Sequence, residues 1–281
     1  MKIKQLNQLI GITASIAVIL LGICLICALI FGVTALVFRE PTAEPSDIET
    51  DTADTAQKDT DVSADPQTVT LQQSADAGMV YIDEMIFFGE STTTHLRSRG
   101  VLSGGTDTKQ VWADSSGTRM LSSQITSLPF IYPETGESLT IAKACFAAKP
   151  KYLVLSFGLN GIVDFIQNKD SYIRNYGKLI QAVQAASPET KIILQTVYPV
   201  RNAANYTVDV ATLNSYIQTL NTWLPEIAAA YHNVRVADTA SVLQDGNGML
   251  LSAYDNGDGI HLTKSAYEAI LQYLRTHSWT D

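Results

Sequence analysis

The pattern of apolar and polar positions in residues 78–281 switches repeatedly between two periods. Short apolar runs rich in β-branched and aromatic residues predict buried strands, whereas apolar positions that recur every three or four residues predict helices. The expected strands are 85–88, 110–113, 152–157, 192–197 and 234–237, and the expected helices are 92–98, 138–148, 171–186, 210–231 and 263–276.

The alternation of these elements along the chain predicts the fold. Residues 152–155 form a near-continuous apolar run, which is typical of a strand covered on both faces of a parallel sheet. Strands that alternate with helices favour a three-layer α/β/α sandwich with right-handed crossovers, here around a mainly parallel sheet of five strands. Residues 99–137 follow neither period and are rich in Gly, Ser and Thr, so we expect loops there, over one edge of the sheet.

The N-terminal part has a different pattern. No charged residue occurs from Leu9 to Phe38. This run is longer than the ~20 residues that a membrane-spanning helix needs, and longer than the ~7–15 apolar residues of a secretory signal peptide. Two lysines precede the run and acidic residues follow Arg39, so the positive-inside rule predicts a cytoplasmic N-terminus. We therefore expect residues 1–39 to be a cytoplasmic stub and one transmembrane helix, with the rest of the chain extracellular. A signal peptide cleaved after residues 33–35 is the alternative.

Residues 40–77 have the composition of a disordered linker. They contain ten acidic residues, one lysine and no aromatic residue, and such a segment cannot offset its chain entropy by burial. Residues 78–281 hold 18 acidic and 15 basic residues, without a basic face that would indicate a nucleic-acid partner. Cys145 is the single cysteine of this part, so no disulfide is expected within it. We interpret 78–281 as the functional domain and 40–77 as a spacer.

A serine stands at the first predicted strand-to-helix turn. The apolar run 85–88 leads into Gly89-Glu90-Ser91, and three threonines follow. A side chain at this turn lies at the carboxyl edge of the sheet, where open α/β sheets bind their ligands. Taken alone, Ser91 is better explained as a helix N-cap, because serine is common at that position.

Three other loops are expected at the same edge, and two of them carry further motifs. Gly158-x-Asn160 follows the third strand, and Asp258-x-x-His261-Leu262 precedes the last helix. Together with Gly89-Glu90-Ser91, these motifs resemble those of the SGNH (GDSL-type) hydrolases in order and approximate spacing. The resemblance covers residues 80–276. It implies a flavodoxin-like α/β/α fold and ester hydrolysis through an acyl-serine intermediate.

The residue types suit that chemistry on physical grounds. The hydroxyl of Ser91 becomes a good nucleophile when a base removes its proton. Histidine is the residue type that suits this task, because the unperturbed pKa of an imidazole, ~6.5, lies near working pH, and His261 is the candidate. Asp258 lies three residues before His261, so one short loop can carry both, and the carboxylate would orient the imidazole. Alternatively, His261 is a capping or surface histidine and Asp258 a turn residue.

A developing oxyanion requires hydrogen-bond donors. Ser91 can offer its backbone N–H group and Asn160 its side-chain amide, although Asn160 next to a glycine also reads as a turn residue. The resemblance implies a third donor, a glycine after the second strand. Gly117 matches it best, and Gly104 and Gly105 are weaker matches.

Two residues depart from the family pattern, and neither belongs to the Ser–His–Asp set. Glu90 replaces the usual Asp of the first motif, keeping the charge on a longer side chain. Gly161 follows Asn160 where the family often has Asp.

Other residues are candidates for contacting substrate. Trp112 lies in a predicted strand and Arg201 follows one, near the carboxyl edge, although ordinary edge packing and surface charge explain the two residues better. His95 lies about one helical turn after Ser91 and could border the site. Few residues that could bind a metal ion are clustered in the sequence, so we expect no metal site, and we expect no cofactor.

The sequence thus predicts a membrane-anchored, extracellular serine esterase. The resemblance implies a substrate class, because membrane-anchored members of this family often remove acyl groups, mainly acetyl groups, from carbohydrate. The expected substrate is therefore a small acyl ester or an O-acetylated glycan. Two alternatives stay open: an O-acyltransferase that uses the same three residues, and a carbohydrate-binding module without activity.

Overall fold

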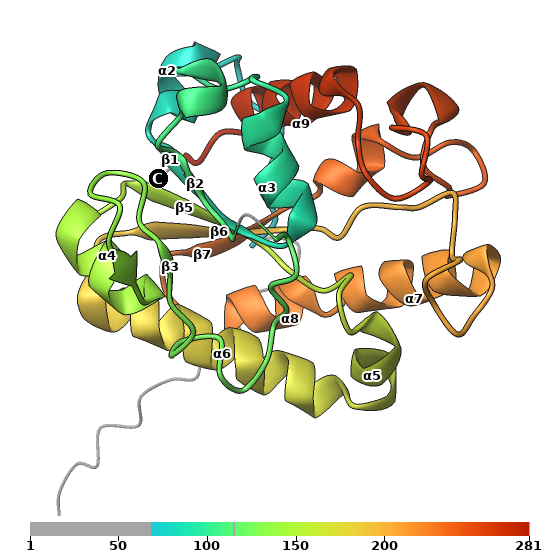
Figure 1. The fold of residues 1–281 in the computed structure, drawn as a ribbon, viewed down its shortest axis with the longest axis horizontal. Coiled ribbons are helices and arrows are strands. Elements are labelled where there is room, and N and C mark those ends of the chain that lie inside the picture. The colour runs from blue at the N-terminus through green and yellow to red at the C-terminus, as the bar shows by residue number, and fades with distance from the viewer. Residues whose placement is uncertain (1–68, 115, 281) are drawn as a thin grey trace, which may run out of the picture. The chain divides into compact units, whose positions relative to one another are not determined.

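The computed structural model describes residues 69–114 and 116–280 (Figure 1). The predicted transmembrane segment 9–38 and residues 40–68 of the predicted linker lie outside this part of the chain. Within the described ranges, no helix combines the length and apolar character needed to cross a membrane.

The centre of the fold is a parallel sheet of five strands. Its strands are β1 (Met85–Gly89), β2 (Val111–Trp112), β5 (Tyr152–Ser156), β6 (Lys191–Gln195) and β7 (Val234–Ala237). Their order in the sheet is β2-β1-β5-β6-β7, and every neighbouring pair is parallel. The five predicted strands and their parallel arrangement are confirmed.

Helices cover both faces of this sheet (Figure 1). The first face carries α2 (Gly78–Asp83), α3 (Ser91–Ser98) and α9 (Lys264–Thr276), and the second carries α4 (Ile141–Ala148), α5 (Ile162–Gln167), α6 (Lys169–Ala186), α7 (Val210–Asn221) and α8 (Leu224–Ala229). Alternate residues of β5 enter two separate apolar clusters: Tyr152 and Val154 pack on the first face, Leu153 and Leu155 on the second. Burial on both faces explains the near-continuous apolar run of this strand.

The long helix predicted at 210–231 is interrupted. Helix α7 ends at Asn221 and α8 begins at Leu224, with Pro225 in its first turn. Proline lacks the N–H group that a continuous helix would use, so it fits a first turn. The side chain of Asn221 also bonds both backbone polar groups of Val197, accepting from the N–H group at 2.8 Å and donating to the carbonyl at 2.9 Å.

The helix predicted at 138–148 begins later, at Ile141. Its first residues instead form the short strand β4 (Ser138–Leu139), which pairs antiparallel with β3 (Phe130–Ile131). Apart from β3, β2 and the 3₁₀ turn η1 (Gly105–Asp107), residues 99–137 form loops, as predicted. The short helices α2 and α5 span six residues each and were not predicted, because so few residues show little periodicity.

The folded part begins earlier than residue 78. Val69 and Leu71 are buried. The N–H group of Leu71 donates to the carbonyl of Val236 at 2.8 Å, and that of Val236 donates to Val69 at 2.9 Å, so this segment extends the edge of the sheet beside β7. Asp76 forms an ion pair with Arg275 of α9. Residues 69–77 of the predicted linker therefore belong to the folded part, because the alternating apolar residues 69 and 71 form a short strand-like pairing.

Candidate active site

Ser91 is the first residue of α3, directly beyond the carboxyl end of β1. The N-cap of α3 is Glu90, whose extended backbone ends the strand, and its carbonyl accepts the N–H groups of Thr93 at 3.0 Å and Thr94 at 3.2 Å. Ser91 is therefore not the N-cap of this helix. The hydroxyl of Tyr267 in α9 donates to the carbonyl of Thr92 at 2.8 Å and ties the start of α3 to a neighbouring helix.

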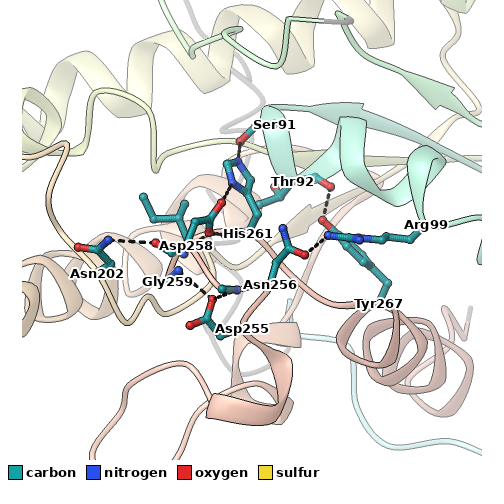
Figure 2. Close-up of polar contacts among 12 residues, drawn as sticks. Ser91, Thr92, Arg99, Asn202, Asp255, Asn256, Asp258, Gly259, His261 and Tyr267 are labelled. Carbon is teal, nitrogen blue, oxygen red and sulfur yellow. Dashed lines mark hydrogen bonds and ion pairs between the residues drawn. The ribbon is translucent and has the colours of Figure 1, made fainter.

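Ser91, His261 and Asp258 form one continuous chain of hydrogen bonds (Figure 2). His261 Nε2 lies 3.0 Å from Ser91 Oγ, and His261 Nδ1 lies 2.7 Å from Asp258 Oδ2. The second carboxylate oxygen of Asp258 accepts the N–H groups of Ile260 and His261, both at 2.8 Å. Partial burial raises the pKa of Asp258, but these hydrogen bonds outweigh it and lower the pKa to about 2. Asp258 is thus a carboxylate at neutral pH, and it faces the imidazole.

The loop that carries both residues is held by hydrogen bonds among its own residues. Asp255 Oδ1 accepts the N–H groups of Gly257 and Gly259, both at 2.8 Å. The N–H group of Asn256 donates to the carbonyl of His261 at 2.9 Å, and Asp255 forms an isolated antiparallel bridge with Leu262. The tight turn holds Asp258 and His261 on one side of the loop, as Figure 2 shows.

Hydrogen bonds from the segment after β6 hold this loop in place. The carbonyl of Gly259 accepts the N–H groups of Arg201 at 2.6 Å and Asn202 at 3.2 Å. The side-chain amide of Asn202 donates to the carbonyl of Asp258 at 3.1 Å. Gly259 has a φ of +78°, and a Cβ atom there would lie 2.3 Å from Asn202 Cβ. This position therefore requires glycine, both for its left-handed backbone and for the close approach.

The two predicted oxyanion donors outside Ser91 lie near the nucleophile, and each is hydrogen-bonded to a backbone carbonyl of the protein. Gly117 has a φ of +64°, and a Cβ atom on it would lie 2.9 Å from Ser91 Cβ. Its N–H group donates to the carbonyl of Asp114 at 3.1 Å. The side-chain amide of Asn160 donates to the carbonyl of Arg119 at 2.9 Å. Because an amide nitrogen carries two hydrogens, Asn160 retains a second donor.

Glu90 connects the nucleophile turn with the loop of Asn160. Its buried carboxyl group accepts the N–H group of Gly158 at 2.8 Å and that of Asn160 at 3.1 Å. Burial raises the pKa of Glu90 to about 8, against the opposing effect of the hydrogen bonds from residues 158, 160 and 159. The longer side chain found here in place of aspartate therefore spans from β1 to the loop after β5.

An open cavity of about 600 Å³ surrounds Ser91 and His261. Within the described ranges, its walls carry hydroxyl, amide, imidazole and apolar groups, and no Asp, Glu, Lys or Arg. The lining residues are Ser91, Thr94, His95, Ser116, Gly117, Thr118, Leu159, Asn160, Gly161, Asn205, Tyr206, Ile260 and His261. The weaker glycine candidates, Gly104 and Gly105, lie at η1 and are not among these lining residues.

Trp112 and Arg201 do not line the cavity, which corrects their prediction as substrate contacts. Trp112 is buried, with its ring stacked on Phe130 at a centroid distance of 5.7 Å. Arg201 Nη1 donates to the carbonyl of Leu250 at 2.7 Å and lies 3.6 Å from an oxygen of Asp245. Position near a strand end did not reveal the direction of either side chain.

Sequence reasoning missed several cavity residues. Thr94 lies three residues after Ser91, a spacing that places it on the same side of α3 and could have been used to find it. Asn205 and Tyr206 come from the long loop between β6 and α7, which shows no period, so no local signal indicates them. His95 borders the cavity, as expected. Within the described residues, no group of three or more His, Cys, Asp or Glu side chains could hold a metal ion.

Comparison with known proteins identifies relatives. Residues 87–269 match the GDSL-like lipase/acylhydrolase family. A structure from Streptococcus pneumonia, proposed to be a platelet activating factor, has 23% identity and a TM-score of 0.50, with 68% of this chain and 82% of that chain covered. A GDSL-like lipase from Bacteroides thetaiotaomicron has 16% identity and a TM-score of 0.47, covering 74% and 90%. A carbohydrate esterase family 3 structure from Talaromyces cellulolyticus has 15% identity and a TM-score of 0.43, covering 68% and 93%. The search of curated proteins finds no match.

Proposed function

Because the chain belongs to the GDSL-like lipase/acylhydrolase family and is a serine ester hydrolase, we propose that Ser91, His261 and Asp258 perform this hydrolysis. The observation that carries the proposal is the unbroken hydrogen-bond chain from Ser91 Oγ through both ring nitrogens of His261 to Asp258. Nucleophile, base and orienting carboxylate are all within the distances that proton transfer requires.

The proposed reaction has two halves. Ser91 Oγ attacks the ester carbonyl carbon while His261 Nε2 takes the hydroxyl proton, and the Asp258 carboxylate stabilises the imidazolium that forms. The tetrahedral intermediate collapses, the alcohol leaves with the proton from His261, and an acyl-Ser91 ester remains. Water, deprotonated by His261, then attacks this ester and releases the acid.

The oxyanion would be bound by the N–H group of Ser91 and the second amide hydrogen of Asn160. Gly117 is the third donor in this scheme, and its N–H group would have to leave the carbonyl of Asp114 to reach the substrate. Substrate binding would therefore rearrange the loop after β2. Each such donor contributes roughly 3 kcal/mol to transition-state stabilisation.

We further propose that the leaving alcohol is a neutral carbohydrate and the acyl group is small, such as acetyl. Support comes from the cavity, which is larger than an acetyl group requires and whose walls carry hydrogen-bonding groups without formal charge. Tyr206 lines it and also packs against the apolar core, so its ring is held in place beside a bound sugar. An anionic alcohol would find no Lys or Arg among the described lining residues.

The cellular setting is proposed from the sequence alone. The uncharged run from Leu9 to Phe38 would anchor the chain in the cell membrane with its N-terminus in the cytoplasm. The acidic segment after it would act as a spacer that lets the enzyme reach cell-surface or environmental glycans. Protease added outside intact cells should then release an active domain by cutting this segment, and protection of the domain would contradict the assignment.

An ester panel on the full-length protein tests the substrate proposal. Acetylated neutral oligosaccharides, a long-chain fatty ester and a phospholipid are compared by kcat/KM for acid release. The proposal predicts the highest value for the acetylated sugars. A preference for the phospholipid or the long-chain ester would contradict it. Adding an unacetylated sugar acceptor to the same assay shows whether the acyl group passes to a sugar hydroxyl in place of water.

A further inference from the structure

A second histidine lies against the imidazole of His261. His95 follows Ser91 by four residues, about one turn of α3, so both side chains are on the same side of the helix. The ring centroids of His95 and His261 are 4.3 Å apart, with an angle of 51° between the ring planes. His95 also lines the cavity, which places it among the groups that a bound substrate would touch.

The surroundings of His95 favour a neutral ring with its proton on Nε2. Nδ1 is buried and has no hydrogen-bond partner in the described part of the chain. A buried N–H group without an acceptor is rarer than a buried lone pair without a donor, so the Nδ1–H tautomer is disfavoured. Burial, the neighbouring His261 and Arg99 lower the pKa of His95, against the opposing charge of Asp258. Nε2 then carries the N–H donor of a ring that lines the cavity.

The position of His95 relates it to the leaving alcohol. His261 Nε2, 3.0 Å from Ser91 Oγ, must deliver a proton to the leaving oxygen, so that oxygen has to approach this nitrogen. A cavity residue in ring contact with His261 borders the alcohol at this moment. The oxyanion donors Gly117 and Asn160 instead come from the loops after β2 and β5.

We propose that His95 is a specificity-determining residue of the alcohol subsite, donating a hydrogen bond from Nε2 to an oxygen beside the ester oxygen of the substrate. The inference rests on the proposed hydrolysis by Ser91 and His261 and specifies its substrate. The preferred alcohol carries a free hydroxyl or ring oxygen on the carbon next to the acylated one, as sugars do. An alcohol that lacks this oxygen would leave the donor of His95 unpaired on binding.

Two matched esters test this in the full-length protein. One is a methyl pyranoside carrying a single acetyl group beside a free hydroxyl, and the other is cyclohexyl acetate, which has a similar ring without oxygen. The selectivity, the ratio of their kcat/KM values, is measured for wild type, His95→Phe and His95→Asn. Loss of one hydrogen bond predicts a selectivity about tenfold lower in His95→Phe. His95→Asn keeps a side-chain N–H donor and should recover part of the selectivity.

The outcomes separate the proposal from its premise. An unchanged selectivity in both variants, with the two esters affected equally or not at all, would overturn the role of His95. Ester hydrolysis by the wild type that survives in Ser91→Ala would instead overturn the proposed function. His232 is exposed and lies far along the chain, after α8, so His232→Asn is the control for losing a histidine and should leave selectivity as it is.

Discussion

The two sides of the candidate site differ in how far they are assembled. On the base side, Ser91, His261 and Asp258 are already in hydrogen-bond contact. On the oxyanion side, which carries the proposed oxyanion donors, the N–H group of Gly117 donates to the carbonyl of Asp114 and the amide of Asn160 donates to the carbonyl of Arg119. The base side is held by a loop closed on itself, whereas on the oxyanion side both donors are bonded to backbone carbonyls of the loop after β2. In the proposed mechanism, proton transfer is therefore preorganised, and oxyanion binding is completed when the substrate binds.

The largest effect is expected from breaking the base side. Ser91→Ala removes the nucleophile and His261→Ala the base, so each should lower kcat for ester hydrolysis about 10⁴- to 10⁶-fold. Because these residues act as one unit, the double variant should be scarcely less active than either single variant. Thermal unfolding of the variants checks that the fold survives. Retention of a tenth of the wild-type kcat in either variant would contradict the assignment.

A change on the oxyanion side should lower activity less, and only in the chemical step. Asn160→Ala removes a donor that acts mainly in the transition state and should lower kcat about 10²- to 10³-fold with little change in KM. Steady-state kinetics on one small ester measure both quantities. A rise in KM at constant kcat would instead show that Asn160 binds the ground state.

Weakening the hydrogen bonds from Asp255 that hold the loop of Asp258 and His261 should lower kcat by a smaller factor. Asp255→Ala removes the acceptor of two backbone N–H groups at 2.8 Å, so Asp258 and His261 lose alignment, and we expect kcat to fall about tenfold. Asp255→Asn retains a side-chain oxygen at this place and is the matched control, with a kcat closer to wild type. Equal losses in both variants would mean that charge, not these hydrogen bonds, matters at this position.

A separate effect concerns the pH dependence of stability, not activity, and comes from Glu90, which joins the two sides. Its pKa is about 8 in the folded state against an ordinary value of 4.5. Between these values the folded state holds a proton that the unfolded state has lost, so the free energy of unfolding should fall as pH rises from about 4.5 to about 8. The slope from this group is about 1.4 kcal/mol per pH unit. Urea unfolding at several pH values should show a flatter dependence for Glu90→Gln. An identical slope in the variant would contradict the raised pKa.

The parts of the molecule that sequence patterns predict are those with local signals. Strand β5 is recognisable because both of its faces are buried, and the turn at Ser91 because glycine and polar residues follow an apolar run. Asp258 and His261 share one short loop, so their proximity follows from three residues of spacing. The contact of this loop with Ser91 is long-range, and it was predictable only because parallel strands deliver their loops to one edge.

The remaining features depend on contacts that no local pattern encodes. Tyr206 reaches the cavity through the long irregular loop after β6, whereas Trp112, the last residue of β2, is buried against Phe130 and does not line the cavity. The break between α7 and α8 combines Pro225 with the bonds of Asn221 to Val197. The sequence pattern places Val69 and Leu71 in a polar linker, because their hydrogen-bond partner, Val236 of β7, lies far along the chain.

The central claim, that Ser91 is the nucleophile activated by His261, is tested most directly by covalent labelling. The full-length protein is treated with a fluorophosphonate probe, and the modified peptide is identified by mass spectrometry. We predict one adduct on Ser91 in the wild type, none in Ser91→Ala and a much slower reaction in His261→Ala. Labelling of a different serine, or labelling that persists in Ser91→Ala, would contradict the account.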